Sequence, residues 1–449
     1  MSTDLNMPPC PADSAPVDVV GAHRTETRRP AARHPENHSV DAHHDAHPGD
    51  ALSRRRRGVL IVLLGAAVAL GPFTVDMYLP AFPDVAASLQ TTDAAIQLTL
   101  TATMIGFGLG QLLIGPLSDA VGRRWPLLIA TSVHVIASIA VVFAQDVTGV
   151  MIGRIFQGLG ASGAAVVAMA IVRDLFSGQK LVRTLARMAL VTGLAPVLAP
   201  VVGAQVLQFV EWRGVFVVLA AYGLLVTVVS AILLFETLPA EDRGTFDRRI
   251  VLRRYRVLVS DRTFLGVLVV GGMTFAALFS YLSSASFVLQ DLYGLSSQQF
   301  ALVFGTNSVG LVFLNQVGAR LMRRHPPRMV LTIGVTLQSM GALALLLTGL
   351  MDLGLVAVLV SLFLSIAPVG LIGPPVQVLA LADHAHEAGT AASMLGAFNF
   401  GVAGLISPVA GFFGISVIAM AAVMCVTLAV AHVSLWLVVR PGVSREVLA

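Results

Sequence analysis

The sequence predicts an all-α integral membrane protein, with twelve transmembrane helices arranged as two six-helix bundles. The chain is 56% hydrophobic and only 12% charged, whereas a soluble domain carries roughly 25% charged residues. Its apolar stretches repeatedly reach the length of about 20 residues that crosses a bilayer. Its basic residues also gather in alternate loops, as they do in multi-pass membrane proteins. These observations exclude a water-soluble fold.

The twelve apolar stretches fall into two sets of six, separated by the longest interior polar segment. A window of about 20 residues identifies each of them. The first six lie near 58–80, 95–117, 126–144, 150–173, 187–209 and 214–236. The second six lie near 263–288, 299–321, 328–350, 353–381, 389–412 and 414–438.

The same reading divides the chain into five parts. Residues 1–53 are polar and Pro-rich without apolar periodicity, which is typical of a disordered cytoplasmic tail. Residues 54–236 form the expected N-terminal bundle, and 237–262 a cytoplasmic linker. Residues 263–440 form the C-terminal bundle, followed by a tail at 441–449.

The distribution of basic residues gives an orientation. If both termini lie in the cytoplasm, the segments on that side hold 23 Lys and Arg without the four arginines of the distal tail, against Arg213 alone on the other side. Cytoplasmic loops carry an excess of these residues in multi-pass proteins. The count therefore supports both the number of helices and cytoplasmic termini.

A short charged turn follows the second apolar stretch and has a weak echo in the second half of the chain. Gly115–Arg124 is too charged to lie in hydrocarbon, so we expect it at a membrane face. Gly318–Arg324 follows the eighth stretch in the same way, keeping glycine and arginines but losing the acid. Duplicated six-helix units with a cavity between them are a transporter architecture. Prolines expected to kink the helices are Pro72, Pro196, Pro200, Pro368, Pro374 and Pro408.

Two charged residues are singled out by their place in apolar stretches. Asp76 lies at the outer part of the first, where a poorly hydrated site would favour the protonated carboxyl group and allow proton binding and release. The alternative is an interfacial, permanently charged Asp76. Arg154 is the only basic residue well inside a stretch. It either satisfies carbonyl groups and holds the bundle together, or pairs with a carboxylate during a proton cycle.

Charged residues at the cytoplasmic helix ends are candidates for a gate that closes the cytoplasmic mouth in an outward-facing state. Solvated charges of this kind otherwise contribute little individually. The gate candidates are Asp119, Arg123, Arg124, Arg173 and Asp174. Uncharged side chains within the stretches are candidates for a substrate cavity, although most polar residues in such helices only bond their neighbours. The cavity candidates are Tyr78, Met104, Gln157, Tyr281, Asn307, Gln338, Gln377 and Asn399.

Motifs for other kinds of chemistry are missing from the sequence. It has no Walker-type loop, no HExxH and no serine or cysteine triad, so no enzyme activity, cofactor or catalytic residue is expected. Cys10 and Cys425 suggest no disulfide framework. The run His43–His47 in the tail lacks a fold to hold a metal, so no metal site is expected. The scattered basic residues do not form a nucleic-acid stripe.

Several of these segments resemble known family motifs. Gly115–Arg124 resembles the loop motif of the major facilitator superfamily, Arg154–Gly163 its fourth-helix motif and Gly193–Gly203 its fifth-helix antiporter motif. Asp76–Pro83 resembles the end of the first helix in the Bcr/CflA subgroup of drug:proton antiporters. Two residues depart from these motifs. Ala120 stands where the loop motif usually has a basic residue after the aspartate, and Ala204 stands where the fifth-helix motif has a glycine. The resemblance covers roughly residues 55–440.

The resemblance implies proton-coupled efflux of hydrophobic drugs, such as bicyclomycin- or chloramphenicol-like compounds, by alternating access. Asp76 would be the proton-linked acid and Arg154 its fourth-helix partner. The implied partners are a small hydrophobic substrate, protons and the lipid bilayer of the bacterial inner membrane, with the protein as a monomer. The alternative is a major facilitator importer of a small metabolite such as a sugar or organic acid.

Overall fold

A computed structural model describes residues 53–244, 248–382, 384 and 388–439. The predicted tails, apart from Ser53, therefore lie outside the described residues, as do Cys10 and His43–His47. Within the described residues the secondary structure is helical, with no strand. Twelve helical segments there are long and apolar enough to cross a membrane. The predicted all-α membrane fold is confirmed.

The first six spans belong to the N-terminal half. They are α1 (Arg54–Asp76), α3 (Asp93–Val121), α4 (Arg124–Val142), α5 (Val147–Leu175), α6 (Gly178–Val206) and α7 (Arg213–Leu233). After α1 the chain makes a 3₁₀ turn at Leu79–Ala81 and a short helix, α2 (Phe82–Ser88). Asp76 is thus the last residue of the first long helix.

The C-terminal half contains the other six spans, two of which are interrupted. Its helices are α9 (Arg262–Phe287), α10 (Ser297–Leu321), α11 (Pro327–Leu350), α12 (Leu355–Ile366), α13 (Val369–Leu381), α14 (Ala388–Ile406), α15 (Val409–Phe412) and α16 (Val417–Ser434). The breaks fall at Pro368 and Pro408, because proline removes a backbone donor and disfavours helix before it. Pro72, Pro116, Pro196 and Pro200 lie inside continuous helices.

Two features extend the sequence prediction. Helix α6 begins at Gly178 rather than near residue 187, so Lys180, Arg183 and Arg187 lie exposed on its first turns. The helix therefore begins before the apolar stretch, and the hydrophobicity window alone could not detect this polar first part. The segment predicted as a linker, 237–262, also contains a helix, α8 (Arg248–Ser260).

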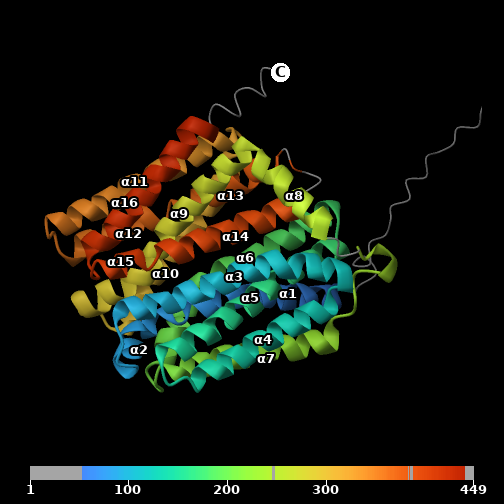
Figure 1. The fold of residues 1–449 in the computed structure, drawn as a ribbon, viewed down its shortest axis with the longest axis horizontal. Helices are drawn as coiled ribbons and strands as arrows, with labels where there is room; N and C mark the ends of the chain where they lie inside the picture. The colour runs from blue at the N-terminus through green and yellow to red at the C-terminus, as the bar shows by residue number, and fades with distance from the viewer. Residues whose placement is uncertain (1–52, 245–247, 383, 385–387, 440–449) are drawn as a thin grey trace, which may run out of the picture. The chain divides into compact units, whose positions relative to one another are not determined.

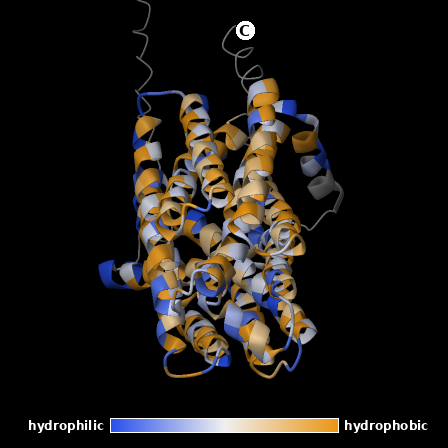
Figure 2. Cartoon of the chain, turned by 90° about the vertical axis from the view of Figure 1, so that its left-hand side faces the viewer, coloured by the Kyte–Doolittle hydropathy of each residue, from blue (hydrophilic) through white to orange (hydrophobic). Residues whose placement is uncertain are grey.

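The helices of each half pack mainly against one another. Helix α5 lies between α3 and α4, and α9 contacts α13, α14 and α16. The two halves meet where α3 lies along α14 and α6 lies along α10 (Figure 1). Hydrophobic residues occur along all the long helices (Figure 2), as expected for segments that cross a bilayer.

Glycines of α5 allow its close packing on both sides. A Cβ atom added at Gly158 would overlap the carbonyl oxygen of Thr103 in α3. A Cβ atom at Gly160 would lie 2.5 Å from the carbonyl oxygen of Ala130 in α4. Small residues at such positions let membrane helices approach closely. The spacing in Arg154–Gly163 therefore has a packing role.

Replacing Gly158 by valine should separate α5 from α3, because a backbone carbonyl cannot move out of the way of the new side chain. Forcing extra carbon atoms into a packed site costs about 1–3 kcal/mol or more. We expect a lower yield of monodisperse protein in size-exclusion chromatography and a lower Tm. Gly401→Val is the matched control, since no atom lies within 4 Å of a Cβ built at that helical position. Equal behaviour of the two variants would contradict the packing role.

Candidate functional site

A cavity of about 300 Å³ lies between the two halves. Its walls come from α1, α3, α5 and α6 on one side and from α9, α10, α12 and α14 on the other. The lining is mainly aliphatic and aromatic. Concave, apolar sites with a few polar groups are typical of small-molecule binding.

Aromatic rings join the two halves across this cavity. Phe107 of α3 stacks on Phe400 of α14 with ring centroids 4.9 Å apart. Phe275 of α9 packs edge-on against Phe400 at 5.4 Å and also contacts Phe279. The sequence analysis did not single out these phenylalanines, since an apolar residue in a span carries no signal that separates a cavity wall from a lipid contact.

Asp76 is the only charged residue that lines the cavity within the described part of the chain. It comes from the end of α1 and is 5% exposed. No hydrogen bond or ion pair joins its side chain to another described residue. A lone carboxyl group in an apolar, partly dry site can exchange a proton as its surroundings change.

Tyr281 and Asn307 form a polar pair on the same cavity. The Asn307 Nδ2 atom donates a hydrogen bond to the Tyr281 hydroxyl oxygen at 3.0 Å. The Tyr281 ring stacks on Phe304, with centroids 5.8 Å apart. These two are the only members of the predicted cavity set that line this cavity.

The other predicted cavity residues occupy different surroundings. Gln338 donates to the Thr274 carbonyl oxygen at 3.2 Å, while Gln377 is exposed. Met104 is fully buried, and Asn399 is half-buried beside Gly271 and Gly272. Gln111 lines the cavity, although the sequence analysis did not select it.

Arg154 is fully buried behind the cavity wall and binds the end of α1. Its Nη1 atom donates to the Thr74 carbonyl oxygen at 2.7 Å and to the Gln157 Oε1 atom at 2.8 Å. The carbonyls of a last helical turn lack intrahelical partners, and a cation is favoured there.

The surroundings of the Arg154 guanidinium are aromatic and polar. It lies over the Tyr78 ring, 4.7 Å from the centroid, and 5.8 Å from the centroid of Phe216. The Gln157 Nε2 atom in turn donates a hydrogen bond to the Ser138 hydroxyl oxygen at 2.8 Å. No ion pair joins Arg154 to Asp76 among the described contacts. Tyr78 and Gln157, both predicted cavity residues, thus surround Arg154 instead.

Hydrogen bonds between the halves close the cavity near the end of α1. Gln97 of α3 donates to the Ser283 carbonyl oxygen at 3.1 Å. The Ser286 hydroxyl donates to the Leu79 carbonyl oxygen at 2.7 Å, and Gln290 donates to that of Pro80 at 3.2 Å. On this side, therefore, the bundles are held together by short polar contacts.

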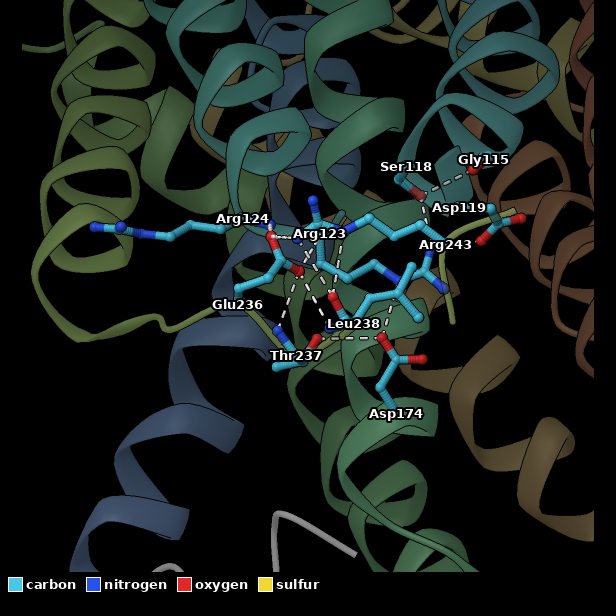
Figure 3. Close-up of polar contacts among 10 residues, drawn as sticks. All are labelled: Gly115, Ser118, Asp119, Arg123, Arg124, Asp174, Glu236, Thr237, Leu238 and Arg243. Carbon is cyan, nitrogen blue, oxygen red and sulfur yellow. Dashed lines mark hydrogen bonds and ion pairs between the residues drawn. The ribbon is translucent and has the colours of Figure 1, made fainter. Parts of the chain in front are cut away.

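A second cluster lies where α3 ends, at the predicted gate (Figure 3). Arg123 is its centre. Its side chain pairs with Asp119 at 2.5 Å and with Asp174 of α5 at 2.9 Å. It also donates to the Ser118 hydroxyl at 2.8 Å. Burial alone would lower the pKa of Arg123, but its hydrogen bonds to Asp174 and Asp119 outweigh burial and raise it.

Glu236, just after α7, completes this cluster. Its carboxylate accepts from the backbone N–H groups of Arg123 at 2.7 Å, Leu238 at 3.1 Å and Arg124 at 3.3 Å. Burial acts to raise the pKa of Glu236, but these hydrogen bonds and the nearby Arg243 charge lower it overall.

The remaining contacts keep the cluster within the N-terminal half and the segment after it. Arg124 donates to the Ala231 carbonyl oxygen of α7 at 2.9 Å, and the Thr237 hydroxyl donates to Asp174 at 3.1 Å. Arg173, also predicted for the gate, is exposed, and the structure shows it in none of these contacts. Glu236 was missed as a member because Arg123 and Arg124, whose N–H groups it accepts from, lie more than a hundred positions before it in the sequence.

Gly122 makes room for this carboxylate. Its φ angle is +99°, in the region that favours glycine, and an added Cβ atom would lie 2.5 Å from the Glu236 Oε2 atom. The turn after α3 therefore requires glycine both for its backbone and for its contact with Glu236.

Glu236→Gln should lower stability at neutral pH and weaken its dependence on acid. Because the folded pKa of Glu236 is lowered, its ionised form stabilises the fold above the ordinary value of about 4.5, and this contribution is lost as the pH falls further. Loss of these charge-assisted bonds costs about 1–3 kcal/mol. Tm values measured in detergent from pH 7 to pH 4 test this. Exposed Glu241 gives the control Glu241→Gln, and an equal effect there would refute the assignment.

Comparison with known proteins places this geometry in a family. The Major Facilitator Superfamily model matches residues 63–408. A Bacillus subtilis protein named as an uncharacterized MFS-type transporter, YdgK, is 35% identical over 376 residues, covering 83% of this chain and 93% of that one. The bicyclomycin resistance protein homolog of Haemophilus influenzae is 29% identical, covering 78% of this chain and 87% of that one. The resemblance to the Bcr/CflA subgroup is confirmed at the level of sequence.

The fold itself has solved counterparts. A bacterial homologue of the human lysosomal transporter Spinster, in an inward-facing and occupied conformation, matches with a TM-score of 0.69 at 15% identity, covering 86% of this chain and 96% of that one. At this identity the likeness shows the arrangement of helices alone. With twelve spans, a cavity between two halves and a family match over most of its length, the chain is a multi-pass membrane transporter, not an enzyme, and belongs to the major facilitator superfamily.

Proposed function

We propose that the protein exports hydrophobic drugs in exchange for protons, by alternating access across the bacterial inner membrane. The observation that carries this proposal is Asp76, the one charged residue among the described residues that line the mainly apolar cavity between the halves. The name of the Haemophilus influenzae relative supports drugs of the bicyclomycin kind. The basic side of the bundle, where α1 begins, is assigned to the cytoplasm by the positive-inside rule.

The cavity wall favours lipophilic cargo over a sugar. Sugar hydroxyl groups need hydrogen-bonding partners, and a site that buries them unpaired loses affinity. Phe107, Phe275 and Phe400 offer none, and the Tyr281 and Asn307 side chains bond each other. The remaining polar side chains on the wall, such as Gln111, are too few to pair with every hydroxyl group of a sugar. An organic acid would need a cation, and Arg154 is not among the lining residues. These features disfavour the importer alternative.

The proposed cycle uses Asp76 as a shared site for proton and drug. Inward-facing protein binds the drug as Asp76 releases its proton to the cytoplasm. The halves then rock outward, and a proton from the periplasm neutralises Asp76 and releases the drug. Proton and drug need only disfavour each other by about 1–3 kcal/mol, the usual range of coupling between sites.

The proton gradient supplies enough free energy for this exchange. One charge moved across the membrane contributes about 2.3 kcal/mol per 100 mV, and each pH unit adds about 1.36 kcal/mol. One proton can therefore drive a neutral drug uphill without ATP. No other energy source needs to be invoked.

Arg154 has the role of a positioning residue in this scheme. It binds the Thr74 carbonyl oxygen, two residues before Asp76, and covers the Tyr78 ring, two residues after it. These contacts hold the end of α1 from both sides. Arg154 thus positions the end of α1, which carries the Asp76 carboxyl group.

Asp76→Asn should abolish drug-driven proton movement while leaving folded protein in the membrane, because the amide keeps the shape of the side chain but cannot titrate. In proteoliposomes, drug added outside should enter the lumen in exchange for protons and alkalinise it with the wild type, but not with Asp76→Asn. In an efflux-deficient host, resistance across an antibiotic panel should fall to the level of the empty vector.

Asp84→Asn is the matched control, since Asp84 is an exposed acid in α2, close behind Asp76 in sequence. It should transport like the wild type. Unchanged efflux in Asp76→Asn would remove Asp76 from the mechanism. Resistance to no drug, together with growth on a sugar that depends on the protein, would instead favour the importer.

Cross-linking Leu79 to Ser286 should stop transport if the halves separate on this side during the cycle. The Ser286 hydroxyl and the Leu79 carbonyl oxygen are 2.7 Å apart and belong to different halves. Leu79→Cys with Ser286→Cys, in a background with Cys10 and Cys425 replaced by serine, should lose efflux on oxidation and regain it with a reductant.

The control pair lies within one half. Ser283→Cys with Ser407→Cys joins α9 to the break after α14, where the two serines are bonded at 2.9 Å. Oxidation of this pair should leave efflux unchanged. Efflux that persists in the fully cross-linked Leu79–Ser286 protein would contradict alternating access at this closure.

A further inference from the structure

A groove outside the central cavity runs between α1 and α7 on the lipid-facing surface. Its volume is about 500 Å³. Val62 of α1 is 64% exposed and Leu225 of α7 is 61% exposed, so two large apolar side chains border it without protein cover. The Tyr222 hydroxyl donates to the Ala66 carbonyl oxygen at 2.7 Å and ties the two helices together at the closed end.

The length of the groove matches one leaflet. Its lining extends along α1 from Arg54 to Ala66. At a rise of about 1.5 Å per residue this is roughly 18 Å, slightly more than half of a hydrocarbon core about 30 Å thick. An acyl chain lying along the groove would therefore reach from the headgroup level to near the bilayer midplane.

Two arginines lie at the open end of the groove, where α1 begins. Arg54 and Arg55 line the groove and are exposed, and neither forms an ion pair with a described residue. The next two arginines contact aromatic rings instead. The Arg56 guanidinium carbon lies 5.6 Å from the centroid of the Phe235 ring, and that of Arg57 lies 5.8 Å from the centroid of the Phe176 ring. The groove thus combines apolar walls with two guanidinium groups at its membrane-surface end.

A second lipid-facing groove, between α4 and α5, provides an internal comparison. Its volume is about 470 Å³, and its lining, from Val133 to Phe156, contains no charged residue. Charge at the mouth therefore distinguishes the α1–α7 groove from the α4–α5 groove.

We propose that the α1–α7 groove binds one anionic phospholipid, with the phosphate on Arg54 and Arg55 and an acyl chain against Val62 and Leu225. Guanidinium groups bind phosphate oxygens in a bidentate manner. Basic pockets between membrane helices on the cytoplasmic side suit anionic headgroups. This site is separate from the drug cavity and does not depend on the proposed transport function.

Native mass spectrometry of delipidated protein, titrated with phosphatidylglycerol or phosphatidylcholine, tests the proposal. One phosphatidylglycerol should bind much more tightly than phosphatidylcholine. Each arginine near an anionic group is worth roughly fivefold in affinity, so Arg54→Gln with Arg55→Gln should weaken binding about 30-fold. Glycerol phosphate, which has the headgroup charge but no acyl chain, should fail to displace the lipid.

Two further variants separate the groove from charge alone. Gly58 lines the groove and has no atom within 4 Å of an added Cβ, so Gly58→Leu should fill the groove without disturbing the helix and displace the lipid. Arg323→Gln with Arg324→Gln removes two exposed arginines after α10, on the basic side, and should leave the tight site intact.

The proposal fails if phosphatidylcholine binds equally well, or if glycerol phosphate displaces the lipid. It also fails if the control pair weakens binding as much as the Arg54 and Arg55 pair, or if Gly58→Leu binds like the wild type. Size-exclusion profiles confirm that each variant is folded. If the arginine pair does not fold, Gly58→Leu still decides the outcome.

Discussion

Unpaired carbonyl groups at helix ends are the constraint around which this protein is organised. The last carbonyls of a helix have no intrahelical partner, and in a low-dielectric setting each needs one. Three arginines meet this need. Arg154 binds the end of α1, Arg124 binds Ala231 at the end of α7, and Arg213 binds Val142 and Ala144 at the end of α4. Each also ties one helix to another.

Arg154 is the most demanding of the three because it is fully buried. A buried guanidinium costs several kcal/mol unless it is well satisfied. Here the Thr74 carbonyl, the Gln157 side chain and the Tyr78 ring offset part of that cost, whereas the Arg154 Nε and Nη2 atoms have no hydrogen-bond partner among the described residues. The same contacts fix the end of α1 and hence Asp76. The contact of Arg154 with the end of α1 and the positioning role proposed for it therefore follow from the same hydrogen bonds.

The sequence predicted the fold well because bilayer thickness sets a length that apolar stretches must match. The twelve spans follow from that length alone. The longest interior polar segment then divides them into two halves. It could not detect α8 or the early start of α6 at Gly178, since helices that extend into water are not marked by hydrophobicity. The sequence predicted residues 353–381 as one span. The break at Pro368 divides this span into two helices, α12 and α13, that together still cross the membrane once.

The site was harder to predict. Asp76 was selected because charge in an apolar stretch is rare, and it lines the cavity. Polar side chains gave a weaker signal, since Gln157 and Gln338 form hydrogen bonds with neighbouring groups away from the cavity. The aromatic wall left no trace in the sequence, because Phe107 and Phe400 gain their role only when α3 and α14 meet.

In the proposed alternating-access cycle, the Arg123 cluster would stabilise one half without bridging the two halves. That cycle requires each half to move as a unit, so the ends of its helices must not slide past one another. Arg123 joins α3 to α5, and Glu236 joins the turn after α3 to the end of α7. The contacts at Gln97, Ser286 and Gln290, by contrast, join the two halves through neutral hydrogen bonds. Charge-assisted bonds are roughly twice as strong as neutral ones. The stronger bonds therefore hold the half together, and the weaker ones lie where the halves must part.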